Sequence, residues 1–265
     1  EQILAVKDDS GALELTPIQH WFFDQSLARP DYFNQAVMLR MDEHIDDAIL
    51  QSVLQAIYEA HPLLNAYFDA GQAHYTSEKQ PLPFQVIDLG AHQEQELQAH
   101  AEKLQSQLSL SKGPISQVAL IRGFADGSSR LLWVIHHLVV DGVSWRILLE
   151  DLAQGYHQAI NHQPVSVLAE TNSFKDWANR LADYTAKLDA KYWLKLPAPT
   201  VLPVDGESGA ICNNISFSLS AQETTHLLQD AHEAYHTQIN DLLLTALTLA
   251  IKDWTGDETI GFHLE

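Results

Sequence analysis

Basic residues and cysteine are both scarce in this sequence of 265 residues. The chain has one cysteine, Cys212, and 15 lysines and arginines against 35 aspartates and glutamates. A single cysteine excludes an internal disulfide framework and fits a reducing compartment. The formal charge of −20 argues against nucleic acids and anionic membrane surfaces as partners, because both are polyanions that would repel the chain.

Long apolar segments and repeats are also missing. The first 25 residues have neither the basic start nor the apolar stretch of a secretory signal. No run approaches the ~18 apolar residues that a membrane-spanning helix needs, and there is no repeat or low-complexity tract. Because 46% of the residues are nevertheless apolar, the chain can bury a sizeable core. We therefore expect a soluble, cytoplasmic, acidic protein.

Helical and strand patterns alternate before residue 196. Apolar residues recur at helical spacing in one segment, and shorter apolar stretches on either side of it are typical of strands. The patterns predict strands near 34–41, 62–69, 115–122 and 130–137, and helices over 46–60, about 92–108 and most of 144–195. The turn Ala125–Ser128 between the last two strands indicates a hairpin.

Residues 196–206 (LPAPTVLPVDG) interrupt this alternation. Their three prolines and one glycine remove backbone donors and helical propensity, which predicts a linker. Beyond it, the pattern predicts a strand at 214–219, helices at about 221–236 and 239–254, and a final strand at about 258–264. We expect an N-terminal lobe over 1–196, a linker over 197–206, and the start of a second, partial lobe over 207–265.

Two histidines, His136 and His137, end an apolar strand. Successive strand side chains point to opposite faces, so one histidine should pack inward and the other should point outward beyond the strand end. A histidine in such a place often only satisfies a buried backbone group. Here, however, Gly142 permits a tight turn with unusual dihedral angles, and Ser144 is placed to cap a helix that begins at Trp145. A strand, a polar turn and a capped helix form a rigid support for catalytic groups.

Three kinds of chemistry compete for this segment. A metal site would need further ligands, and no other histidine or acidic residue stands at convincing ligand spacing. A nucleophilic Ser144 would want a Gly-x-Ser-x-Gly elbow, and the second glycine is absent. General acid–base catalysis by a histidine with Asp141 nearby is the simplest fit, because imidazole titrates near neutrality.

The motif at 136–145 (HHLVVDGVSW) resembles the HHxxxDG motif of the condensation-domain superfamily of non-ribosomal peptide synthetases, whose relatives resemble chloramphenicol acetyltransferase. Segments 15–22 (LTPIQHWF) and 241–247 (DLLLTAL) are similar to the opening motif and to the long helix of the second lobe in that superfamily. The resemblance covers the whole chain in order. It implies an α+β fold, a two-lobed chloramphenicol acetyltransferase-like sandwich with a complete N-terminal lobe and a partial C-terminal lobe.

Within the superfamily, the motif resembles the epimerization branch more than the condensation branch. Condensation domains usually carry tryptophan directly after the DG pair, and this chain has Val143 there, with Trp145 two residues later. The last residues, 262–265 (FHLE), are similar to the strand that leads into the EGHGRE motif of the epimerization branch. The resemblance therefore implies epimerization of an α-carbon from L to D.

The resemblance also implies a substrate and partners. The substrate would be an aminoacyl or peptidyl thioester on the phosphopantetheine arm of a peptidyl carrier protein, and the domain would need no cofactor or metal of its own. Adjacent adenylation and condensation domains would be further partners. His137 is the candidate acid–base residue on one face of the α-carbon, and Glu265 is the candidate on the other.

The remaining motif residues would support the site. We expect His136 to pack and hydrogen-bond beneath it, Asp141 to brace the turn, and Trp145 to belong to the core. In the first helix, we expect Trp21 and Phe22 to pack between elements.

One departure from the family concerns the partner of Asp141. Asn65 stands where family members usually have an arginine, so Asp141 would need Arg122, Arg146 or donors from its own turn.

Three other readings stay open. A condensation domain would use the same histidine to assist attack by an amine on the thioester. His136 and Asp141 also match the HxxxxD motif of glycerolipid acyltransferases, although the negative charge and missing membrane segments count against that reading. A truncated lobe that only binds carrier or partner domains is the non-enzymatic alternative.

Overall fold

The computed structural model describes residues 11–41, 44–69, 72–75, 81–90, 93–167, 173–195, 202–203, 215–231 and 236–262. Contacts between residues divide the chain into two compact units, residues 1–188 and 189–265. Within the described residues, both β-sheets belong to the first unit, which also contains the histidine motif.

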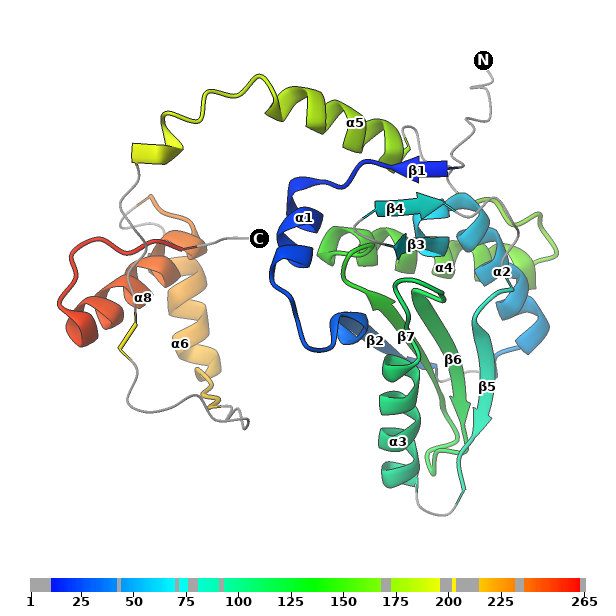
Figure 1. The fold of residues 1–265 in the computed structure, drawn as a ribbon. Coiled ribbons are helices and arrows are strands. Elements are labelled where there is room, and N and C mark those ends of the chain that lie inside the picture. Colours follow the sequence, from blue (N-terminus) through cyan, green and yellow to red (C-terminus); the bar gives the residue numbers. More distant parts are fainter. Residues whose placement is uncertain are drawn as a thin grey trace. The chain divides into compact units, whose positions relative to one another are not determined.

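The larger described sheet has four strands in the order β2-β7-β6-β5 (Figure 1). These are β2 (Asn34–Met41), β5 (Phe84–Asp88), β6 (Ser116–Arg122) and β7 (Ser129–His136). β5 and β6 run parallel, and the other pairs are antiparallel. Residues 131–135 of β7 are apolar without alternation because both faces of the sheet are covered. The strands predicted near 34–41, 115–122 and 130–137 are confirmed, with His137 just beyond the end of β7.

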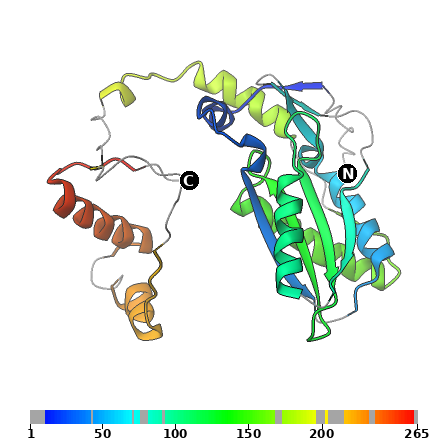
Figure 2. The ribbon, with the colours of Figure 1, turned by 60° about the horizontal axis from the view of Figure 1, so that its bottom comes forward.

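Helices cover both faces of this sheet (Figures 1 and 2). α2 (Asp47–Ala60) and α4 (Gly142–Ile160) pack on one face, and α3 (Gln93–Ser106) packs on the other. The apolar stripe of α2 is almost fully buried at Leu50, Val53, Leu54 and Ile57. Each such side chain contributes about 1.5–3 kcal/mol by leaving water. The predicted helices at 46–60 and 92–108 are therefore confirmed.

α2 and α4 approach each other closely at a glycine. A Cβ atom built on Gly155 of α4 would lie 2.8 Å from Cγ1 of Val53 on α2. Real side chains do not tolerate such a distance, so this position requires glycine for packing rather than for its backbone conformation.

A smaller described sheet has the strand order β1-β4-β3. Its strands are β1 (Gly11–Leu13), β3 (Ala66–Asp69) and β4 (Gln72–Tyr75). The predicted strand at 62–69 is correct only from Ala66 onward. Residues Pro62–Asn65 form a 3₁₀ turn, η2, because proline has no N–H to donate to a strand ladder and its fixed φ suits the first position of a helical turn.

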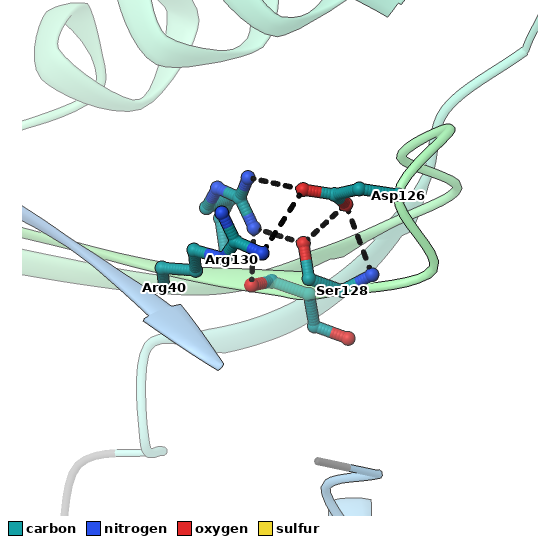
Figure 3. Close-up of polar contacts among 5 residues, drawn as sticks. Arg40, Asp126, Ser128 and Arg130 are labelled. Carbon is teal, nitrogen blue, oxygen red and sulfur yellow. Dashed lines mark hydrogen bonds and ion pairs between the residues drawn. The ribbon is translucent and has the colours of Figure 1, made fainter. Parts of the chain in front are cut away.

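The predicted hairpin turn between β6 and β7 is also confirmed (Figure 3). Asp126 accepts a hydrogen bond from the Ser128 N–H at 3.0 Å and lies 3.3 Å from Arg130 and 3.5 Å from Arg40. The hydrogen bonds from Ser128 lower the pKa of Asp126 to about 2. This polar cluster stabilises the start of β7, whereas the histidines lie at its other end.

The first unit has further described helical segments before and after the motif along the chain. α1 (Pro17–Asp24) is followed by the 3₁₀ turn η1 (Pro30–Tyr32), and α5 (Phe174–Thr185) follows α4 along the chain. Among the helices in the described ranges, none is both long and apolar enough to cross a membrane.

The regular elements described in the second unit are helical. It contains η3 (Trp193–Lys195), α6 (Ala221–Thr225), the π-helical turn η4 (His226–Asp230) and α8 (Ile239–Thr255). The helix predicted at 239–254 is confirmed, and the one predicted at 221–236 is helical through residue 231. The strands predicted at 214–219 and 258–264 are wrong for residues 215–219 and 258–262, which pair with no described strand. A strand needs a hydrogen-bonded neighbour, which a sequence pattern alone does not supply.

Candidate active site

The two histidines stand at the end of β7 and differ in burial. His136 is the last residue of β7 and pairs with Asn34 of β2. The backbone N–H of His137 donates to the carbonyl of Phe33 at 2.9 Å, which extends the contact between the two chain segments by one residue. His136 is fully buried, and His137 is half-buried.

His136 lies in a closed packing layer. Its Nε2–H donates to the carbonyl oxygen of Pro30 at 2.9 Å, and its Nδ1 accepts from the N–H of Leu138 at 3.1 Å. The ring of Phe22 meets it edge-on, with the centroids 5.6 Å apart. Burial lowers the pKa of His136, so the ring is neutral near neutral pH. With both nitrogens engaged, this residue ties β7 to η1.

His137 has a defined tautomer. Its Nδ1 lies 2.9 Å from the carbonyl oxygen of Val140, which can only accept, so Nδ1 carries the proton. Nε2 then has a free electron pair, and the side-chain amide of Gln35 lies 3.2 Å from it. The ring of Phe33 stacks on the imidazole at a centroid distance of 5.3 Å and an interplanar angle of 17°. The basic nitrogen of this histidine is therefore Nε2.

Asp141 is the N-cap of α4. One of its carboxylate oxygens accepts from both the N–H and the hydroxyl of Ser144, each at 2.7 Å. These hydrogen bonds, the backbone one first, lower the pKa of Asp141. The prediction that Ser144 caps the helix is wrong, because the carboxylate three residues earlier takes that place and the helix begins sooner.

Gly142 is the first residue of α4 and does not adopt a positive φ. The predicted unusual dihedral angles at this position are therefore wrong. A Cβ atom at Gly142 would meet nothing within 4 Å, so open space lies over the N-terminus of α4.

In the described residues, the hydrogen-bond partner of the Asp141 side chain is Ser144 rather than an arginine. Asn65 donates to the carbonyl of Tyr58 at 3.2 Å. Arg122 pairs with Asp47, and Arg146 lies 3.4 Å from Glu150. Of the partners considered for Asp141, the structure shows the donors of its own turn, the N–H and hydroxyl of Ser144.

Trp145 belongs to the core. It is 7% exposed and meets Trp133 edge-on at a centroid distance of 5.8 Å. Its Nε1–H donates to Oε1 of Gln35 at 2.8 Å. Sequence reasoning did not single out Gln35, because its two partners lie 102 and 110 residues away along the chain.

A second glutamine joins the motif to α1. Gln19 is 2% exposed, and its Nε2 donates to the carbonyl of Leu138 at 3.1 Å. Its Oε1 accepts from the N–H of Thr16 at 3.0 Å. Beside it, Phe22 is buried but Trp21 is 46% exposed, so the predicted packing of this aromatic pair is right only for Phe22. In the sequence, Gln19 is a polar residue within the apolar stripe of a short helix, which is a sign of a buried polar contact.

An open groove of about 400 Å³ borders the motif helix. Ser144 and Ile147 of α4 line one part of it, and Phe174 and Trp177 of α5 line another. Neither His137 nor Asp141 lines this groove. In the described part of the chain, no three His, Cys, Asp or Glu side chains converge as a metal site would require. Glu265, the predicted second acid–base residue, lies outside the described residues.

The family model of the condensation domain matches residues 9–265. Chondramide synthase cmdD of Chondromyces crocatus is 40% identical over 278 residues, which cover 96% of this chain and 7% of that protein. A solved epimerization domain, from the third module of tyrocidine synthetase B, is 35% identical with a TM-score of 0.82, over 95% of this chain and 61% of its own. The first condensation domain of the calcium-dependent antibiotic synthetase shares the fold at 22% identity, with a TM-score of 0.73 over 94% of this chain and 62% of its own.

These likenesses confirm the predicted α+β fold. The chain spans less than two thirds of each solved domain and a small part of the curated synthase. Its family model nevertheless runs through the histidine motif and over nearly every residue, and so the chain belongs to the condensation domain family.

Proposed function

We propose that this chain is part of an epimerization domain, which inverts the α-carbon of an aminoacyl or peptidyl thioester from L to D during non-ribosomal peptide synthesis. The likeness to the solved epimerization domain, at 35% identity, exceeds the likeness to the solved condensation domain, at 22%. The substitution of Val143 for the usual tryptophan points the same way.

The single structural observation that carries the proposal is the geometry of His137, which supplies a base, while the choice of epimerization over condensation rests on the likeness above. Its proton is committed to the carbonyl of Val140 through Nδ1, which leaves Nε2 as a base. In the proposed reaction, Nε2 takes the α-proton, and the electrons of the Cα–H bond delocalise into the thioester carbonyl to form an enolate. Protonation of the same carbon from the opposite face then completes the inversion. A thioester favours this step because its carbonyl accepts carbanion charge better than that of an amide.

Glu265 is the proposed proton donor on the opposite face. The residues around the motif would act as supports: His136 beneath the site, Asp141 and Ser144 at the helix cap, Gly142 beside the open space and Trp145 in the core. The proposed domain organisation is an N-terminal lobe over 1–196, a linker over 197–206 and the start of a second lobe over 207–265.

The proposed partner is a peptidyl carrier protein, which brings the substrate on its phosphopantetheine arm. Adenylation and condensation domains of the same synthetase would be neighbours, and the domain would need no cofactor of its own. Because the chain carries a formal charge of −20, docking of an acidic carrier would rest on apolar contacts and a few basic residues. We therefore expect only weak salt dependence.

The second candidate is condensation, which the name of the matching family model favours. A condensation domain would use His137 to assist attack by an amine, and it would need a second, acceptor-loaded carrier. Mutation of His137 cannot separate the two reactions, since both need it. The fate of the α-proton can, because a condensation domain never has to break that bond.

The test uses the complete protein with one loaded carrier in deuterium oxide and no acceptor. We expect solvent deuterium at the α-carbon and a mixture of L and D products, detected by chiral chromatography with mass spectrometry. If deuterium never enters, and peptide forms only after an acceptor carrier is added, condensation takes the place of epimerization.

A further inference from the structure

A chain of three side chains runs from the core to the candidate base. Trp145 on α4 donates its Nε1–H to Oε1 of Gln35 on β2, at 2.8 Å. The amide nitrogen of Gln35 lies 3.2 Å from Nε2 of His137. Gln35 stands opposite Ile135 in the β2–β7 ladder, which fixes its height relative to the end of β7.

The chemistry of these groups fixes which one donates and which one accepts in each hydrogen bond. An indole nitrogen can only donate, so it holds the oxygen of the Gln35 amide toward Trp145. The NH₂ group of the amide must then face His137, where it can only donate as well. Nε2 of His137 therefore has to be an acceptor, and Nδ1 has to carry the proton that Val140 accepts.

We propose that Gln35 is a positioning residue that, oriented by Trp145, holds His137 in the tautomer with the basic electron pair on Nε2. Val140 and Gln35 fix the ring at its two nitrogens, and Phe33 stacks against its face. This inference rests on the proposed function only in taking Nε2 as the reacting atom. The tautomer itself does not depend on any substrate.

The contact with Gln35 also requires an Nε2 without a proton. A protonated Nε2 would point its hydrogen at the NH₂ group, so the contact has to break whenever Nε2 holds a proton. At 3.2 Å the bond is at the long end of the normal range, and a substrate proton would have to take the place of the amide at Nε2. The titratable groups close to His137 in the described residues are His136, which is neutral, and Asp141, whose hydrogen bonds to Ser144 favour its ionised form. Both stay in place in the variants below.

The test measures the tautomer directly in the 265-residue chain. Long-range ¹H–¹⁵N spectra of the protein labelled at histidine report which ring nitrogen is protonated, and His137→Gln identifies the signals of residue 137. In the parent protein we expect a protonated Nδ1. Gln35→Glu keeps an acceptor for Trp145 but presents an acceptor to His137, so a proton should appear on Nε2 while Nδ1 keeps its hydrogen bond to Val140. Gln35→Met and Trp145→Phe leave Val140 as the restraint on the ring, so a measurable minor fraction of the Nε2–H tautomer should appear.

Gln85→Glu is the matched control, because Gln85 is exposed on β5 at the other edge of the same sheet. It should leave the His137 signals unchanged. Circular dichroism identifies variants that have not folded. If Gln35→Glu does not fold, the tautomer is measured in Gln35→Met and Trp145→Phe instead. An unchanged Nδ1–H tautomer in the folded Gln35 and Trp145 variants would overturn the inference.

The complete protein supplies a second readout. Gln35→Glu should lower the rate of α-proton exchange at neutral pH about tenfold and move the acidic limb of its pH profile upward by about one unit, because an added carboxylate favours a protonated ring. If exchange occurs in the parent but neither the tautomer nor the profile changes in Gln35→Glu, the inference about Gln35 is wrong. If the tautomers change as expected and no exchange occurs in the parent, the proposed function fails and the inference stands.

Discussion

Asp141 and Ser144 form a closed cap at the start of α4, in which one carboxylate oxygen receives both the N–H and the hydroxyl of the serine. Asparagine is nearly as good an N-cap as aspartate, whereas alanine cannot accept. Asp141→Asn should therefore keep appreciable exchange activity, and Asp141→Ala should lose most of it and about 1 kcal/mol of stability. Thermal unfolding and α-proton exchange measure the two effects. Equal inactivity of both folded variants would mean that the charge itself takes part in the chemistry.

The same carboxylate predicts a pH dependence. The pKa of Asp141 is lower in the folded protein than in the unfolded chain, so its stabilisation is complete above the ordinary aspartate pKa and is lost as pH falls through the folded value. The difference in melting temperature between the parent and Asp141→Ala should therefore shrink on acidification from pH 5 to pH 3. A difference that stays constant over this range would contradict the cap as the source of the effect.

His136 should matter for folding. His136→Ala removes a fully buried ring and leaves the carbonyl of Pro30 without its donor, so we expect a loss of about 3 kcal/mol. Burial lowers the pKa of His136, so the unfolded chain binds the proton first and stability falls as the pH drops below about 6.5. The contribution is at most about 1.4 kcal/mol per pH unit. In His136→Gln, the free energy of unfolding, measured by chemical denaturation, should fall less steeply between pH 7 and pH 5 than in the parent.

Two glycines of α4 should respond in opposite ways to alanine. At Gly155 the new Cβ would lie 2.8 Å from Val53, so Gly155→Ala should destabilise by about 1–3 kcal/mol, and Val53→Ala in the same chain should recover part of the loss. Gly142→Ala meets nothing within 4 Å and should be neutral or stabilising by about 0.5–1 kcal/mol. Denaturant unfolding of the single and double variants checks both. A folded Gly142→Ala without exchange activity would mean that substrate uses the space beside it.

The proposed acid–base pair is tested in the complete protein. His137→Ala should fold, because the side chain is half-buried at a strand end, and should abolish α-proton exchange. Glu265→Gln should reduce exchange sharply if that carboxylate protonates the opposite face. As a control, Asp126→Asn changes a carboxylate at the far end of β7 and should leave exchange intact. Parent-like activity of His137→Ala would remove the central proposal.

Local patterns predicted the elements whose side chains repeat with a clear period. The stripe of α2 and the unbroken apolar run of β7 are such signals, and the structure has both. The errors occurred where an alternative local group competes. Pro62 turned a predicted strand start into a 3₁₀ turn, and Asp141 displaced Ser144 as the cap because a carboxylate three residues earlier offers the better acceptor.

The site could be located but not completed from the sequence. The HHxxxDG segment is contiguous, so its place at a strand end was readable. Gln35 and Gln19 reach the motif from other elements, across 102 and 119 residues. The apolar stripe around Gln19 marks it as unusual, but no local pattern shows that either glutamine contacts the motif. The predicted strands of the second unit failed for a related reason, since pairing depends on residues distant in sequence.

The pairing of β2 with β7 has a consequence for how the protein is made. The contact of Gln35 with His137 spans 102 residues, so β2 leaves the ribosome long before its partner exists. At ordinary synthesis rates of about 5–20 residues per second, its hydrogen-bonding groups wait roughly 5–20 s for β7. During this interval the strand is an open edge that holdase chaperones or another nascent chain can occupy. Closure of the sheet and placement of His137 beside Gln35 are then one late event, so premature termination before β7 yields a chain without the histidine motif.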